Sequence, residues 1–134
     1  MPSKTMRKLE LTLDHLPWPE LSPNSRLHWA VKARAVKSTK DEIGWLAKAA
    51  GWTCYHKPMQ KARISYEFHL KDNRRRDLDN LLASCKSLVD GLVDVGVLAD
   101  DDSKHLEIGS VKCIQGTKEQ TVISLTEMPE YNLK

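Results

Sequence analysis

Several features that would place the protein in a special class are missing from its sequence. No apolar run approaches the roughly 20 residues of a membrane-spanning helix, and the basic first ten residues contain no apolar segment of a secretory signal. The three cysteines (Cys54, Cys85 and Cys113) have no Cys-x-x-Cys spacing and cannot all pair with one another. Neither a disulfide framework nor a zinc site is therefore expected. We expect a cytoplasmic protein with no membrane partner.

Aromatic residues are scarce, and a nucleotide-binding loop is missing. Aromatics make up 6% of the chain, so a hydrophobic core must rely on Leu, Val, Ile and Ala. The absence of a Gly-x-x-x-x-Gly-Lys loop argues against an ATP-type site. A length of 134 residues fits one domain, since a single core usually serves about 100–200 residues. We expect a single domain over residues 1–134, with a core at about 9–127 and loose ends.

Charge is distributed unevenly along the chain. The net charge is +3, but residues 1–76 carry 16 Lys or Arg and 7 Asp or Glu, a balance of +9. Residues 77–134 carry 5 and 11, a balance of −6. This separation indicates a basic surface for a polyanion and a distinct acidic cluster.

The hydrophobic pattern predicts strands and helices in alternation. Alternating apolar residues favour strands at 9–16 and 61–70. A capping-box pattern at 38–41 predicts the start of a helix that ends at Gly51. An apolar stripe predicts a second helix at 78–93, with Cys85 buried in it, and residues 106–114 and 121–126 are expected to form a hairpin around Gly116. The fold class is therefore α/β (α+β), a small mixed sheet in β-α-β-α-β-β order with helices packed on one face.

The most informative stretch begins with two carboxylates at a predicted strand-to-helix junction. Asp77 and Asp79 are two residues apart, and in extended backbone such side chains point the same way. Oxygen ligands of this kind suit Mg²⁺, with Mn²⁺ as an alternative. The competing interpretation is that Asp77 merely caps the helix, where acids are favoured by the helix dipole.

An acidic loop at 98–104 follows the second predicted helix. If this loop returns to the start of that helix, one of its aspartates, Asp100, Asp101 or Asp102, can supply a third carboxylate. Three such acids close together would repel one another unless a cation offset their charge.

Lys86 and Asp90 are spaced i, i+4 in the same predicted helix. They lie 7 and 11 residues after Asp79, which places all three on one face of a continuous helix. Lys86 is then expected to contact a phosphate or to act as an acid for the leaving oxygen. The alternative is an exposed ion pair of little energetic consequence.

Basic residues occur in two places that suit a phosphodiester substrate. Three arginines directly before the paired acids can hold non-bridging oxygens while a metal polarises the phosphorus and generates a hydroxide. A second basic group lies before the first predicted helix and forms either a DNA-backbone surface or a solvated loop. The arginines are Arg74, Arg75 and Arg76, and the second group is Arg26, His28, Lys32, Arg34 and Lys37.

Other aromatic and imidazole side chains carry less information. Trp18 and Trp29 can stack on unpaired bases, but burial is the favoured expectation for both. The histidines His56, His69 and His105 are expected to be structural or on the surface, because no second ligand stands at metal-binding spacing.

These motifs together resemble the RusA family of Holliday-junction resolvases. The resemblance rests on Arg-Arg-Asp-Leu-Asp-Asn, a following lysine, Asp-Gly-Leu-Val-Asp-x-Gly-Val-Leu, an Asp-Asp pair and an N-terminal proline-rich loop. It covers residues 11–127 and implies a homodimer, of bacterial or phage origin, that makes paired nicks in four-way DNA with Mg²⁺ held by three aspartates. Carried over by residue, Asp77, Asp79 and Asp101 match those aspartates, and Lys86 and Arg76 match the lysine and the arginine.

The expected function is therefore Mg²⁺-dependent cleavage of branched DNA. Two alternatives stay open: a non-catalytic module that binds DNA junctions, and a different Mg²⁺-dependent phosphodiesterase that acts on nucleotides.

Overall fold

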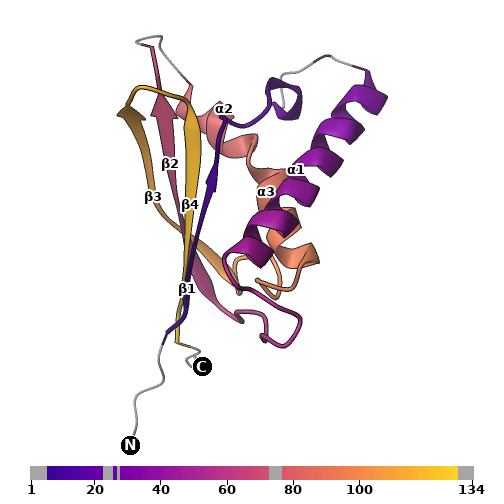
Figure 1. The fold of residues 1–134 in the computed structure, drawn as a ribbon, viewed down its shortest axis with the longest axis vertical. Helices are drawn as coiled ribbons and strands as arrows, with labels where there is room; N and C mark the ends of the chain where they lie inside the picture. The colour runs from indigo at the N-terminus through magenta and orange to yellow at the C-terminus, as the bar shows by residue number, and fades with distance from the viewer. Residues whose placement is uncertain (1–5, 23–25, 27, 73–76, 130–134) are drawn as a thin grey trace, which may run out of the picture.

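The computed structural model describes residues 6–22, 26, 28–72 and 77–129. A four-stranded sheet in the order β1-β4-β2-β3 forms one layer, and the helices cover one of its faces (Figure 1). This mixed sheet with helices on one side confirms the α+β prediction. The elements, in chain order, are β1 (Lys8–Leu13), a 3₁₀ turn η1 (Pro19–Leu21), α1 (Trp29–Ala49), β2 (Ala62–Leu70), α2 (Leu78–Ala83), α3 (Lys86–Asp94), β3 (Leu106–Gln115) and β4 (Gln120–Glu127).

Alternation of apolar and polar residues determines which face of the sheet is covered. In β2 the side chains of Ile64, Tyr66 and Phe68 are buried beneath the helices, while the residues between them face outward. The strands β1 and β4 show the same alternation, so the predicted half-buried strands are confirmed. Most of β3 is exposed, because it lies at the edge of the sheet.

The predicted hairpin of the last two strands is wrong. β2 lies between β3 and β4, pairing parallel with β3 and antiparallel with β4. The connection from β3 to β4 crosses the end of β2, where the Gly116 amide donates to the Leu70 carbonyl at 2.8 Å. The helices α2 and α3 form a crossover that delivers β3 parallel to β2, which a short-range turn signal cannot reveal.

The first helix begins earlier than the capping-box pattern predicted. α1 starts at Trp29, and the His28 ring accepts a hydrogen bond from the Ala30 amide at 3.1 Å. The expected capping residues, Ser38 and Thr39, lie inside the helix, with Thr39 buried. At these interior positions, the backbone amides that a capping side chain would bind already donate to carbonyls of the preceding helical turn. The predicted stop is confirmed, since Gly51 has a φ of 98° just after the helix.

The second predicted helix is two helices. The Cys85 amide bonds to the Leu82 carbonyl, three residues back, and the Ser84 hydroxyl donates to the Asn80 carbonyl at 2.8 Å. These contacts tighten the turn and end α2 before α3 begins. The spacing of Asp79 and Lys86 predicted that both lie on one face of a continuous helix. Because the helix is interrupted between them, this prediction is wrong.

The core lies between the sheet and the pair α1 and α3. Leu88 and Leu92 of α3 pack into the same cluster as Ile43 of α1 and the buried strand residues. Cys85 is buried there as expected, and burial raises the pKa of its thiol to about 12. The chain termini, 1–5 and 130–134, lie outside the described residues. We expected a loose tail from Met128 onward. The Met128 amide nevertheless donates a hydrogen bond to the Lys61 carbonyl at 2.8 Å.

Candidate functional site

Asp77 stands at the N-cap of α2. Its Oδ1 accepts a hydrogen bond from the Asn80 amide at 3.2 Å, and Asp79 follows in the first turn of the helix. Both carboxylates are exposed. Asp77 therefore caps the helix, as the competing interpretation predicted. Capping uses only one oxygen of the carboxylate, so the second oxygen can contact a ligand.

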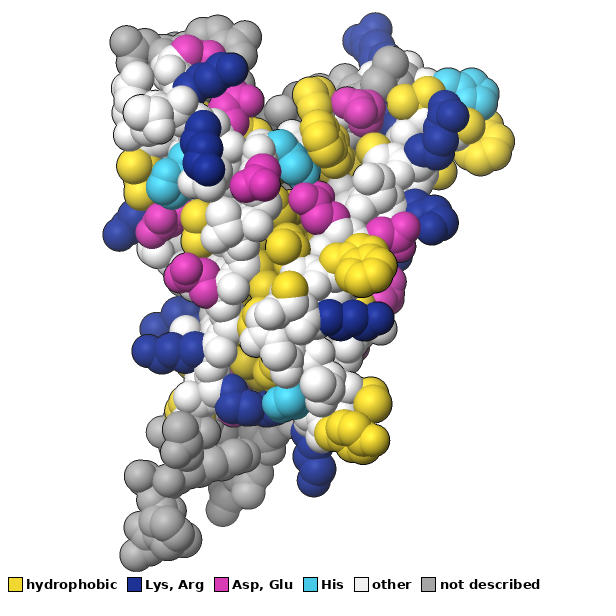
Figure 2. All heavy atoms as spheres, in the orientation of Figure 1, with side chains coloured by type: hydrophobic (Ala, Val, Ile, Leu, Met, Phe, Trp, Pro, Cys, Tyr) yellow, Lys and Arg dark blue, Asp and Glu magenta, His cyan; other side chains and the backbone are white. Residues whose placement is uncertain are grey.

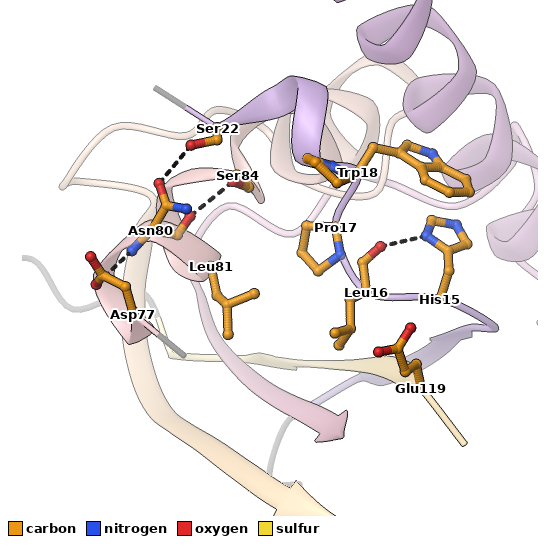
Figure 3. A pocket seen from close by; sticks show the side chains of 11 residues that line it. His15, Leu16, Pro17, Trp18, Ser22, Asp77, Asn80, Leu81, Ser84 and Glu119 are labelled. Atoms are coloured by element: carbon orange, nitrogen blue, oxygen red, sulfur yellow. Dashed lines mark hydrogen bonds between the residues drawn. The ribbon is translucent and has the colours of Figure 1, made fainter. Parts of the chain in front are cut away.

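A hollow of about 400 Å³, here named the Trp18 hollow, opens beside Asp77 (Figure 3). One wall is the loop after β1, the opposite wall is α2, and Glu119 lies at the turn before β4. The Ser22 hydroxyl donates to Asn80 Oδ1 at 2.7 Å and ties the two walls together. The hollow is lined by His15, Leu16, Pro17, Trp18, Pro19, Ser22, Asp77, Asn80, Leu81, Ser84 and Glu119.

His15 and Glu119 were not predicted as site residues. The imidazole of His15 stacks on Trp18, with ring centroids 3.9 Å apart and an interplanar angle of 16°. Its Nε2 contacts Glu42 Oε1 at 2.8 Å, which links the loop to α1. Trp18 itself is half-buried, and the proline-rich sequence around it was the available signal for this wall.

Lys86 lies between two carboxylates. Its Nζ is 3.7 Å from Asp90 Oδ1 and 3.7 Å from Asp101 Oδ2. The i, i+4 pair with Asp90 was expected, and the contact with Asp101 brings the acidic loop back to the first residue of α3. The lysine side chain is 75% exposed, so its ammonium remains accessible to a ligand.

The structure places Asp77 and Asp101 in different hollows. A second hollow of about 400 Å³, the Lys86 hollow, is lined by Lys86 and Asp101 together with apolar residues that include Leu82 and Ile108. Adjacent residues of α2, Leu81 and Leu82, face the two hollows separately. Asp77, Asp79 and Asp101 are all described, and they are not among the groups of three whose ligand atoms lie within 4.8 Å of one another.

The group that meets this criterion in the described part of the chain is Asp100, Asp102 and His105. Asp102 Oδ1 lies 2.6 Å from His105 Nδ1 and also accepts the backbone amide of Lys104 at 3.0 Å. The hydrogen bond from His105 holds the pKa of Asp102 below its usual value. Asp100 and Asp102 were predicted as alternative ligands. His105 was expected to be structural or on the surface, and its contact with Asp102 closes the turn.

The remaining histidines behave as expected. His56 accepts from the Thr53 amide at 3.0 Å and stacks on Trp52, and His69 contacts Glu67 at 3.3 Å on the open face of the sheet.

The predicted basic surface lies partly on a helix. Lys32 and Arg34 belong to α1 and not to a loop before it, whereas Arg26 does precede the helix. Basic side chains along the α1 side of the molecule alternate with acidic ones (Figure 2), as in the pair of Lys37 and Asp41 at 2.9 Å. The predicted arginines Arg74, Arg75 and Arg76 lie outside the described residues.

The burial expected for Trp29 is wrong. Its side chain is 74% exposed at the first residue of α1, because the inward stripe of that helix begins at Ala35.

Comparison with known proteins identifies one informative relative. The chain is 32% identical over 114 residues to an "Uncharacterized protein" of Xylella fastidiosa, and the alignment covers 83% of this chain and 73% of the relative. No model of a known protein family matches the chain. Within the described ranges, no helix combines the length and apolar character needed to cross a membrane.

Proposed function

The chain belongs to the same family as the uncharacterized Xylella fastidiosa protein, and we propose that it is a Mg²⁺-dependent, structure-selective endonuclease. Its substrate is branched DNA, and its activity is the resolution of Holliday junctions by paired nicking, as the resemblance to the RusA family implies.

One observation carries this proposal: Lys86 lies within 3.7 Å of both Asp90 and Asp101. The contact joins the acidic loop to the start of α3 and places an exposed cation beside the exposed carboxylate of Asp101 and the half-buried one of Asp90. A cation in this position can neutralise a phosphate that the carboxylates alone would repel. Its ammonium can also stabilise the charge that grows on the leaving oxygen.

The residues present fit a Mg²⁺ site by their chemistry. Asp77, Asp79 and Asp101 offer exposed carboxylate oxygens, and Mg²⁺ is usually held by one or two carboxylates with several waters. Asp77 and Asp79 at the start of α2 supply two carboxylates of the kind required, without Asp101. A bound ion would supply charge neutralisation at the phosphate and an activated water. Mn²⁺ takes the same ligands.

Other parts of the chain contribute binding. Arg26, Lys32 and Arg34 lie on or just before α1 and are suited to the DNA backbone, and Arg74, Arg75 and Arg76 directly precede Asp77 in the sequence. A homodimer is part of the proposal because paired nicks require two active sites. The exposed edge strand β3, where Ile108 is 56% exposed, is a surface that suits a second copy.

The test is a nuclease assay on a synthetic four-way junction, with and without Mg²⁺. We expect symmetric nicks near the branch point only when the metal is present, and no cutting of a linear duplex of the same sequence. Binding of the junction without any metal-dependent cleavage would contradict the proposed activity. Cleavage of mononucleotides or nucleotide diesters in preference to the junction would favour the phosphodiesterase alternative.

A specific observation favours a second candidate, a non-catalytic module that binds DNA junctions. Asp77 caps α2, and Asp102 closes its own turn with His105, so two of the acids have structural roles. Under this alternative the acidic residues stabilise helix and loop ends, and only the basic residues contact DNA.

A further inference from the structure

The Trp18 hollow is large enough for a small ligand and is not explained by phosphate chemistry. We propose that it binds a single nucleobase that has left the base stack at the branch point of the DNA. This inference rests on the proposed function, because it names which part of the branched substrate enters the molecule. The volume of about 400 Å³ lies within the usual range of small-molecule sites.

The aromatic wall of the hollow is held in position by its neighbours. His15 covers the Trp18 indole at 3.9 Å between centroids, and both of its ring nitrogens are engaged, by the Leu16 carbonyl at 2.7 Å and by Glu42 at 2.8 Å. Trp18 and His15 lie together at one side of the hollow in Figure 3. A fixed aromatic side chain offers a base a stacking surface without an ordering penalty, and such stacking tolerates any base.

The polar groups of the hollow suit a neutral ring and not an anion. Asn80 accepts the Ser22 hydroxyl on its Oδ1, which leaves its amide nitrogen as a donor. Asp77, the N-cap of α2, lines the hollow with an exposed carboxylate that repels phosphate. Carboxylates accept hydrogen bonds from exocyclic amino groups, so adenine, cytosine and guanine are favoured over thymine.

The position of the hollow indicates which base would enter. It lies between α2, the loop after β1 and the turn before β4, and proteins that bind a single base in a recess generally take that base out of the stack. Bases at a branch point are the easiest to extrude, since they have the least pairing and stacking to lose. Because Asp77 forms part of the wall, the bound base is the one that flanks the phosphodiester bond proposed to be cut.

The experiment is a double-mutant cycle between DNA and protein. Four-way junctions with a single abasic site at each position around the branch are titrated against the full-length protein without divalent metal, and dissociation constants are measured. We expect loss of one particular base to weaken binding on the order of 10-fold. The same abasic site should not weaken the binding of Trp18→Ala any further, because that variant has already lost the stacking contact.

Matched variants separate this effect from general damage. Trp45→Ala removes an exposed indole on α1 that does not line the hollow, and should keep the parent's sensitivity to the abasic site. Trp18→Phe retains an aromatic wall, so its binding should again be sensitive to the abasic site. This variant keeps the test valid even if Trp18→Ala proves poorly folded. Thymine at the sensitive position should bind more weakly than cytosine.

The outcomes are distinguishable. A parent protein that binds and cuts junctions but is indifferent to every abasic site would overturn the base pocket and leave the proposed function intact. Equal sensitivity in Trp18→Ala and the parent would overturn it as well. A parent protein that does not prefer junctions to linear duplex would remove both proposals together.

Discussion

Lys86 Nζ and Asp101 Oδ2 lie 3.7 Å apart, although the whole of α3 and the turn at Gly96 separate them in the chain. A parallel bridge between Met59 and Leu98 holds the start of the acidic loop against the segment that leads into β2. The chain then turns back toward the start of α3, so two regions identified separately in the sequence meet at one surface.

Lys86→Ala tests whether this surface takes part in cleavage. The ammonium should act mainly in the transition state, so junctions should bind nearly normally but be cut on the order of 100- to 1000-fold more slowly. Single-turnover cleavage measures the rate, and Lys8→Ala, which removes an equal charge from the exposed side of β1, is the control. A rate within a few-fold of the parent would exclude Lys86 from the reaction.

Asp77→Asn separates catalysis from helix capping. Asparagine is as good an N-cap as aspartate, so the unfolding free energy should change little. Cleavage should be abolished while junction affinity is kept or increased, since the variant loses a metal ligand and a repulsion toward phosphate. Asp41→Asn on the outer side of α1 is the matched control. Parallel loss of binding, cutting and thermal stability would instead support a purely structural Asp77.

Arg34→Ala tests the basic surface of α1. Each phosphate contact releases about one counterion, so the slope of log affinity against log salt concentration should fall by roughly 1. The loss of affinity should be similar for junctions of different sequence. A filter-binding or anisotropy titration over several salt concentrations measures both quantities, and an unchanged slope would remove Arg34 from the interface.

The pair of His105 and Asp102 should make stability depend on acid pH. The hydrogen bond lowers the pKa of Asp102 in the folded state, so its contribution is present above the unfolded pKa and is lost as the pH falls through the folded one. His105→Ala should raise the Asp102 pKa toward the ordinary carboxyl value, as NMR titration would report. Any stability difference between parent and variant that comes from this bond should vanish in strong acid. An unchanged Asp102 pKa would show that the contact is not maintained in solution.

Gly91→Ala tests the close approach of α1 and α3. An added Cβ would lie 3.1 Å from Ile43 Cβ and 3.3 Å from the Lys40 Cα, where the backbone cannot yield easily. Overpacking of this kind costs about 1–3 kcal/mol, more than the roughly 1 kcal/mol that alanine gains over glycine in a helix. Gly44→Ala meets only the half-exposed Val95 side chain and should be neutral or stabilising. Chemical denaturation of both variants gives the comparison, and a Gly91→Ala protein as stable as Gly44→Ala would contradict the packing argument.

Local patterns predicted those parts of the fold that local forces determine. The predicted alternation in β2 and the predicted helix end at Gly51 were correct, because strand burial and a left-handed glycine after a helix depend on nearby residues. The pairing of β3 was missed because its partner, β2, is chosen through a crossover and not through a turn. The break between α2 and α3 was missed because the apolar stripe continues through it, and only the hydrogen bonds of Ser84 and Cys85 reveal it.

For the candidate site, the sequence indicated residue types better than their arrangement. The contact of Lys86 with the acidic loop depends on where that loop turns, which no spacing encodes. The proline-rich sequence around Trp18 was a signal for one wall of the Trp18 hollow, but nothing in the sequence showed that Glu119 lies near it. The two come from separate strand ends that the sheet brings together.

The place of β4 in the sheet has a consequence for how the protein folds during synthesis. Within the described residues, β1 forms a ladder only with β4, and β4 is the last strand of the chain. β1 must therefore wait for the synthesis of residues 120–127 before it can be paired, and β2 gains its second neighbour at the same moment. Such long-range pairing slows folding. Nascent chains that end before Gln120 should thus expose an incomplete sheet, in which β1 is unpaired and β2 has only β3 as a neighbour.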